Sequence, residues 1–241
     1  TVWNINSTAV GGGVAEMLQS MLAFTRGLGI DARWLVIDGP PEFFQFTKRL
    51  HHALHGEAGD GSSMGPVQRK LYEDTLRENA VDLSARVQEG DFVLLHDPQT
   101  AGLAPELIKL GAHVIWRCHI GLEETNAITE GVWDYLKAYF GDYDQFVFSL
   151  KEYVLPGIAE KTALIPPSID PLSHKNRTLQ MHKSINIMVQ AGILEPRGPQ
   201  VYEDYGHQVR RVMPDGSFAT VNQHHPFDLI YRPVITEISR W

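Results

Sequence analysis

The chain has 241 residues, of which 43% are apolar and 21% charged, the composition of an ordinary globular domain with a substantial core. Its net charge of −8 and the lack of any run rich in lysine and arginine argue against nucleic-acid binding, and no apolar run approaches the ~20 residues that a membrane-spanning helix needs. The single cysteine, Cys118, excludes an intramolecular disulfide and fits a reducing compartment. We therefore expect a cytoplasmic protein in which Cys118 is a small buried residue.

The first 17 residues carry the most informative local pattern. A strand is expected at residues 1–6, followed by Gly11, Gly12 and Gly13 and then by an amphipathic helix. Glycine allows backbone conformations that a Cβ forbids, and the N-terminus of the helix favours an anion such as a sugar phosphate. A tight turn that needs glycine only for packing is the alternative. The dinucleotide-binding pattern G-x-G-x-x-G is not met, because Glu16 stands in place of its third glycine.

Strand and helix patterns then alternate along the chain. Short apolar strands separated by helices are typical of a parallel sheet with helices on both faces, so we expect a Rossmann-like α/β fold. We predict the further strands at residues 32–37, 91–95, 113–116, 145–148 and 163–165, and the further helices at residues 42–54, 67–87, 102–110 and 128–140.

Three polar clusters follow the expected strands: the glycine loop, residues 96–99 and residues 117–126. Ligands of open parallel sheets bind beyond the carboxyl ends of the strands, so these clusters are predicted to form one site. The predicted substrate-binding residues are Gly11, Gly12, Gly13, Glu16, His96, Asp97, Gln99, Arg117 and Asn126.

Two other arrangements of histidine suggest alternative sites. His51 and His55 stand four residues apart on a helix, as zinc ligands can, but no acidic residue nearby completes the set, so a solvated or sugar-facing surface is expected instead. His96 beside Asp97 could orient a general base. No serine or cysteine nucleophile motif accompanies them, so a hydrolase triad has little support.

The last third of the chain breaks the alternating pattern. Residues 210–221 are predicted to form a β-hairpin about Pro214, Asp215 and Gly216. We expect a first domain at residues 1–176, an atypical insertion or connection at 177–231, and the first strand of a truncated second domain at 232–241.

Taken in order, several motifs resemble one known family. They are the runs VGGGVAE (10–16), GIDARW (29–34), HDPQ (96–99), WRCHI (116–120), PPSIDPLS (166–173) and RPVITEISR (232–240). Their order and spacing over residues 1–176 are similar to those of the trehalose synthase and trehalose phosphorylase branch of the retaining (family 4-like) glycosyltransferases. Members of this branch have the two-domain GT-B fold.

The resemblance implies that the N-terminal half mainly holds the acceptor sugar, whereas the C-terminal half holds a nucleotide-sugar donor. By the same resemblance the glycine loop approaches the donor phosphates, and His119 contacts the transferred glucose. Arg240, after Ser239, helps to hold the phosphates. His119 and Arg240 are thus the predicted catalytic residues. The implied reaction moves glucose from UDP-glucose or ADP-glucose to glucose, forming trehalose, with no metal and no further cofactor.

Two other functions remain open at this point. A trehalose phosphorylase, which cleaves trehalose with phosphate, shares the same motifs, and a non-catalytic sugar- or anion-binding module is the alternative outside the enzymes. We expect this chain to be the N-terminal half of the enzyme and to be inactive alone. The expected partners are small sugars (glucose, trehalose) and the nucleotide-sugar, with neither nucleic acid nor membrane, and a homodimer is kept as an alternative.

Overall fold

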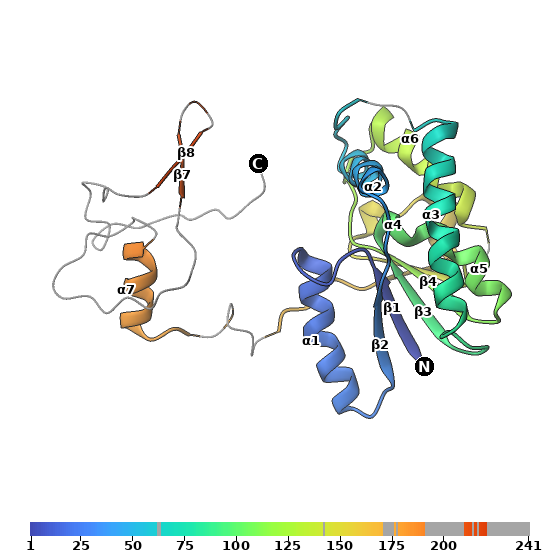
Figure 1. Ribbon diagram of the computed structural model, residues 1–241, viewed down its shortest axis with the longest axis horizontal. Helices are drawn as coiled ribbons and strands as arrows, with labels where there is room; N and C mark the ends of the chain where they lie inside the picture. Colours follow the sequence, from blue (N-terminus) through green and yellow to red (C-terminus); the bar gives the residue numbers. More distant parts are fainter. Residues whose placement is uncertain are drawn as a thin grey trace. The chain divides into compact units, whose positions relative to one another are not determined.

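The first 169 residues are built around a sheet of six parallel strands in the structure, a computed structural model (Figure 1). The structure describes residues 1–61, 64–141, 143–170, 176, 178–190, 210–213, 215 and 217–220. It divides into two units, Thr1–Ile169 and Asp170–Trp241, which are described separately. The strands of the first unit are β1 (Val2–Asn6), β2 (Ala32–Val36), β3 (Phe92–His96), β4 (His113–Cys118), β5 (Gln145–Phe148) and β6 (Thr162–Leu164).

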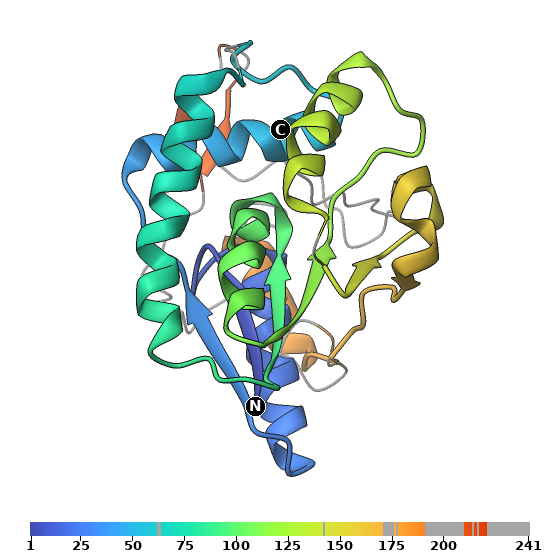
Figure 2. The same cartoon turned by 90° about the vertical axis from the view of Figure 1, so that its right-hand side faces the viewer.

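The strand order is β2-β1-β3-β4-β5-β6, and every neighbouring pair is parallel. Figure 2 shows the strands side by side, with their carboxyl ends pointing away from the N-terminus. From β1 the chain first moves to β2 on one side and later continues with β3 on the other. The gap between the ends of β1 and β3 is therefore the topological switch point, where ligands of such sheets bind.

Helices cover both faces of this sheet. The helix α1 (Gly13–Gly27) packs over β2 through Leu18 and Leu22, whereas the other helices share the main core on the opposite face. In Figure 1, α1 lies on one side of the strands and α3 and α5 lie on the other. These other helices are α2 (Pro41–Leu54), α3 (Pro66–Ser84), α4 (Asp97–Thr100), α5 (Ala104–Lys109) and α6 (Ala127–Leu136), with short 3₁₀ helices at Ala101–Leu103, Lys137–Tyr139, Lys151–Tyr153 and Pro156–Lys161. The expected Rossmann-like sheet is confirmed.

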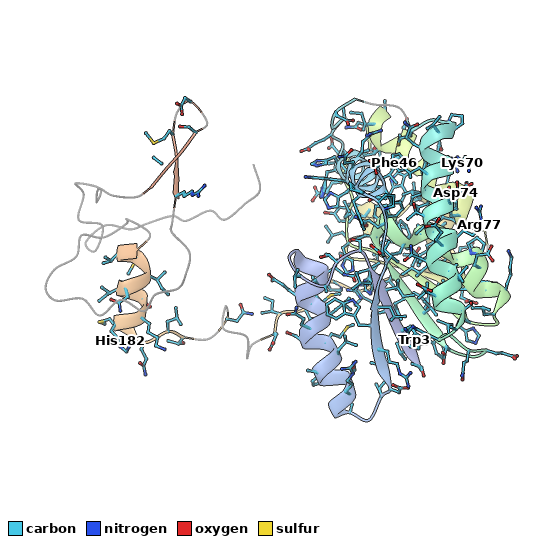
Figure 3. The ribbon with its side chains drawn as sticks, viewed as in Figure 1. Trp3, Phe46, Lys70, Asp74, Arg77 and His182 are labelled. Carbon is cyan, nitrogen blue, oxygen red and sulfur yellow. The ribbon has the colours of Figure 1, made fainter. Side chains whose placement is uncertain are left out.

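The helices are amphipathic in the way that their apolar spacing predicts. Phe46 of α2 is buried in the core, whereas Lys70, Asp74 and Arg77 of α3 point away from the sheet, where Asp74 pairs with both cations (Figure 3). Trp116 of β4 lies at the centre of an aromatic cluster with the rings of Trp133, Phe140, Phe146 and Phe148. Cys118, two residues along the same strand, is also buried, as expected.

Two local differences from the sequence prediction concern helix boundaries. His96, predicted to follow the strand, is the last residue of β3, and the next four residues form the short helix α4, which was not predicted. The Thr100 hydroxyl closes this turn by donating to the His96 carbonyl at 2.8 Å. The helix predicted at residues 128–140 is divided, because its last turn has 3₁₀ geometry.

The second unit contains three described elements. These are α7 (Met181–Gln190), β7 (Arg210–Val212) and β8 (Phe218–Thr220), and the two strands pair antiparallel. The predicted hairpin is therefore confirmed, and Asp215 stabilises its turn by accepting from the Ser217 N–H at 2.9 Å. The strand predicted at 232–241 lies outside the described residues, and the predicted domain boundaries remain predictions. No helix in the described part of the chain is long and apolar enough to span a bilayer.

Candidate functional site

The glycine loop leads from the carboxyl end of β1 into α1. Gly11 has φ of 74°, and Gly12 has φ of 86° with ψ of 154°, a region that is essentially restricted to glycine. A Cβ placed on Gly11, Gly12 or Gly13 would meet no heavy atom within 4 Å. Packing alone therefore does not explain these glycines. They give the loop its path and leave its backbone open to a ligand.

The loop also presents an uncapped helix N-terminus. No side chain caps the first turn of α1, so its leading N–H groups and positive dipole end are available to an anion. Within the loop, the Asn6 amide donates to the Thr8 carbonyl at 2.8 Å, and the Thr8 hydroxyl donates to the Val10 carbonyl at 2.6 Å. These bonds hold the loop in shape without using the helix end.

Gly12→Ala is expected to lower the free energy of unfolding by about 1–3 kcal/mol, the cost of forcing an L-residue into this backbone region. Gly13→Ala is the matched control, because Gly13 has no positive φ, meets equally open space and already lies in α1. Urea denaturation of both variants measures the difference. Equal stabilities of the two variants would contradict the strained geometry.

Two histidines from neighbouring strands meet at the same edge of the sheet. His96, at the end of β3, is only 1% exposed, and its Nδ1 lies 3.1 Å from Nε2 of His119, just after β4. Its other nitrogen, Nε2, lies 3.2 Å from Oδ1 of Asn4 on β1. The side chains of three adjacent segments thus form one hydrogen-bonded row across the switch point.

Asp97 follows His96 in a backbone conformation that is rare for a residue with a Cβ, with φ of 62°. Hydrogen bonds from His119 and Trp116 help to hold it there. Its Oδ1 accepts from the His119 backbone N–H at 2.8 Å, and its carbonyl accepts from the indole of Trp116 at 3.0 Å. Strain that is fixed in this way by its surroundings is typical of functional sites.

Burial sets the protonation of this cluster. Burial raises the pKa of Asp97 to about 7, against the opposing effects of the His119 N–H and of Arg117. Burial, helped by the charge of Arg117, lowers the pKa of His119 to about 4, and burial lowers the pKa of His96 well below its usual value. Both imidazoles are therefore neutral near pH 7. Neutral rings and amides suit hydrogen bonding to the hydroxyl groups of a sugar.

Arg117 supplies positive charge beside these neutral groups. It pairs with His96 in the β3–β4 register and shares its face of the sheet. Its Nε is buried and has no hydrogen-bond partner among the described residues, and its Nη2 reaches the Ile165 carbonyl only at 3.5 Å. A buried donor without a partner is energetically costly, so this guanidinium is suited to donate a hydrogen bond to an acceptor atom of a ligand.

The other predicted residues lie in different settings. Glu16 is exposed on the first turn of α1, and Gln99 is half-buried in α4. The ring of His51, on α2, lies 5.0 Å from that of His55, the C-cap of this helix. No group of three metal-binding side chains occurs in the part of the chain that the structure describes. Arg240 lies outside the described residues.

Asn126 is the N-cap of α6. Its Oδ1 accepts from the N–H groups of Ile128 and Thr129, both at 3.0 Å, and its Nδ2 donates to the Gly56 carbonyl at 3.2 Å. Asn126→Ala is therefore expected to destabilise the chain by about 1 kcal/mol, whereas Asn126→Asp, which keeps the capping oxygen, changes stability less. Thermal denaturation of both variants measures this. Equal losses in the two variants would show that the cap contributes little.

The fold and this edge of the sheet define a Rossmann-like domain of the GT-B type. The structure described as "Trehalose-6-phosphate from E. coli bound with UDP-2-fluoro glucose" matches 80% of the chain and 55% of its own length with a TM-score of 0.58. A trehalose-6-phosphate synthase studied with bisubstrate glycomimetics matches 70% of the chain and 49% of its own length with a TM-score of 0.53. Because the sequence identities are only 16% and 17%, these structural similarities show the fold alone.

The family follows from the sequence match. The family model of the trehalose synthase N-terminal domain matches residues 4–155, and the chain belongs to this family. The chain is 40% identical over 199 residues to trehalose synthase of Pyrococcus horikoshii, and the match covers 81% of the chain and 45% of the relative. Trehalose synthase of Rubrobacter xylanophilus is 39% identical, with 80% and 45% covered. Trehalose phosphorylase of Pleurotus pulmonarius is 28% identical, with 72% and 25% covered.

These matches confirm the expected family and fold. The chain spans less than half the length of the relatives it matches. Asn4 is a residue of this candidate site that the sequence prediction missed, although a polar amide in the middle of a buried strand was a signal that could have indicated it.

Proposed function

We propose that this chain is the acceptor-side domain of a retaining glycosyltransferase that moves glucose from a nucleotide-sugar, UDP-glucose or ADP-glucose, to glucose and so forms trehalose. One observation carries the proposal: the neutral row of His96 and His119, with Asp97, lies at the same sheet edge as the open glycine loop. Neutral hydrogen-bonding side chains suit the hydroxyl groups of a sugar, and the open glycine loop suits a sugar phosphate.

In this proposal the two features have separate roles. The glycine loop and the N-terminus of α1 donate N–H groups to the donor phosphates, where negative charge develops as the nucleotide leaves. His119 and Arg117 hydrogen-bond glucose hydroxyls, with Asp97, Gln99 and Glu16 as further contacts. Arg240 is proposed to help to hold the phosphates. Neither a metal nor a further cofactor is included.

Glucose binding to the 241-residue chain tests the sugar site. His119→Ala is expected to weaken binding by about tenfold, the loss of roughly 1.4 kcal/mol of hydrogen bonding. His113→Ala is the control, because this residue lies at the opposite end of β4 and its side chain is 54% exposed. Isothermal calorimetry gives the affinities, and an unchanged affinity in His119→Ala would contradict the assignment.

Trehalose phosphorylase is kept as a second candidate, because the Pleurotus enzymes match 72–80% of the chain at 28% identity. Incubation with glucose and UDP- or ADP-glucose, or with trehalose and phosphate, tests both reactions. We propose that the chain alone carries out neither, since it spans less than half of these relatives. Robust trehalose formation by the chain would contradict this. A cytoplasmic location remains part of the proposal, and a homodimer remains an alternative.

A further inference from the structure

The two hydrogen bonds that join Asn4, His96 and His119 have a defined donor and acceptor at each step. Asn4 is 1% exposed in the central strand β1, and it places its Oδ1 against His96 Nε2 at 3.2 Å. A carbonyl oxygen only accepts hydrogen bonds, so His96 must carry its proton on Nε2. A neutral imidazole has one N–H, and therefore His96 Nδ1 is an acceptor.

The same logic extends one ring further. His96 Nδ1 faces His119 Nε2 at 3.1 Å, so His119 donates its own N–H to it. The remaining nitrogen, His119 Nδ1, is then left without a proton. It has no hydrogen-bond partner among the residues that the structure describes, whereas the backbone N–H of His119 is held by Asp97 at 2.8 Å.

We propose that Asn4 and His96 are positioning residues that fix His119 in the tautomer with an unprotonated Nδ1, so that this nitrogen accepts a hydrogen bond from a hydroxyl group of the sugar. The sugar part of this inference rests on the proposed function, whereas the tautomer does not. The hydroxyl that faces His119 must act as a donor, which distinguishes it from hydroxyls that only accept. Neither Asn4 nor His96 needs to touch the sugar.

The tautomers can be read directly from histidine ¹⁵N chemical shifts of the intact chain without ligand, because protonated and unprotonated ring nitrogens resonate far apart. We expect unprotonated Nδ1 in both rings. Loss of peaks in His96→Gln and His119→Gln assigns the signals. A protonated Nδ1 on either ring overturns the proposal.

Two substitutions test the origin of the tautomer. Asn4→Asp keeps an acceptor at the same place, so both tautomers should persist, whereas Asn4→Leu should leave His119 as a mixture of tautomers. If the Asn4 amide instead donated to His96, Asn4→Asp would invert both rings and overturn the proposal. If Asn4→Leu does not fold, the spectra of the wild type and of Asn4→Asp still show whether Asn4 accepts from His96 and so fixes the tautomers. Thr100→Val is the control, since it removes a buried hydroxyl bound to the His96 carbonyl and should alter stability but not tautomer.

The sugar part has its own readout. In a series of deoxyfluoro-glucoses, fluorine can accept but cannot donate. One position should therefore lose about tenfold in affinity for the wild-type chain but not for His119→Ala. If no position behaves in this way, the sugar contact of His119 is overturned, while the nitrogen shifts decide the tautomer independently.

Discussion

Trp116→Ala should lower the free energy of unfolding by about 3–5 kcal/mol, the range for removing a large aromatic side chain from a core. Trp116 is 0% exposed, and its ring contacts those of Trp133, Phe140 and Phe146. Urea denaturation measures the loss. Phe24→Ala is the control, because Phe24 is 69% exposed on α1 and should change stability by less than about 0.5 kcal/mol.

Trp116→Phe separates packing from the link to the site. Phenylalanine keeps much of the ring but lacks the indole N–H that donates to the Asp97 carbonyl. We expect this variant to lose less stability than Trp116→Ala but to weaken glucose binding, because Asp97 is then held by one bond fewer. Wild-type affinity in a folded Trp116→Phe variant would show that the indole does not position the site.

Asp97→Asn is expected to raise the free energy of unfolding at pH 8 by about 2 kcal/mol. A pKa shift from 3.8 to about 7 corresponds to roughly 4 kcal/mol at 1.36 kcal/mol per unit, and the partial exposure of the residue reduces this. Asparagine tolerates the positive φ and retains an oxygen for the His119 N–H. The same change removes a carboxyl group from the proposed sugar site, so glucose affinity should fall while stability rises.

The sign of the pH dependence makes this prediction specific. Because the pKa of Asp97 is higher in the folded chain, the folded state binds the proton more tightly, and the contribution of Asp97 to stability falls as pH rises from about 4 to 7. His119 acts in the opposite sense. Its pKa is lowered to about 4, so its contribution is present above the usual histidine pKa of 6.5 and is lost as pH falls toward 4.

The difference between Asp97→Asn and the wild type isolates the aspartate contribution, since both chains contain His119. The gain in stability should be near zero at pH 4 and reach its full size by pH 8. Chemical denaturation at several pH values between these limits measures it. A difference that is independent of pH, or a variant that is less stable at pH 8, would contradict a half-buried Asp97 whose pKa is raised in the folded chain.

Much of this site could be predicted from the sequence for a simple physical reason. Parallel strands align their carboxyl ends, so polar residues that follow β1, β3 and β4 must gather at one edge. What could not be predicted depends on register and side-chain geometry. The bond of Asn4 to His96 joins residues 92 positions apart, and the positive φ of Asp97 depends on bonds from Trp116 and His119. Spacing alone shows neither.

The most direct measurement is an NMR titration of the 241-residue chain with glucose and with trehalose. If the sheet edge is the sugar site, the backbone signals of Gly11, Gly12, Asp97 and His119 should shift together and saturate at one affinity, while His113, at the other end of β4, stays unchanged. Saturable shifts elsewhere, with none at these four residues, would contradict the account.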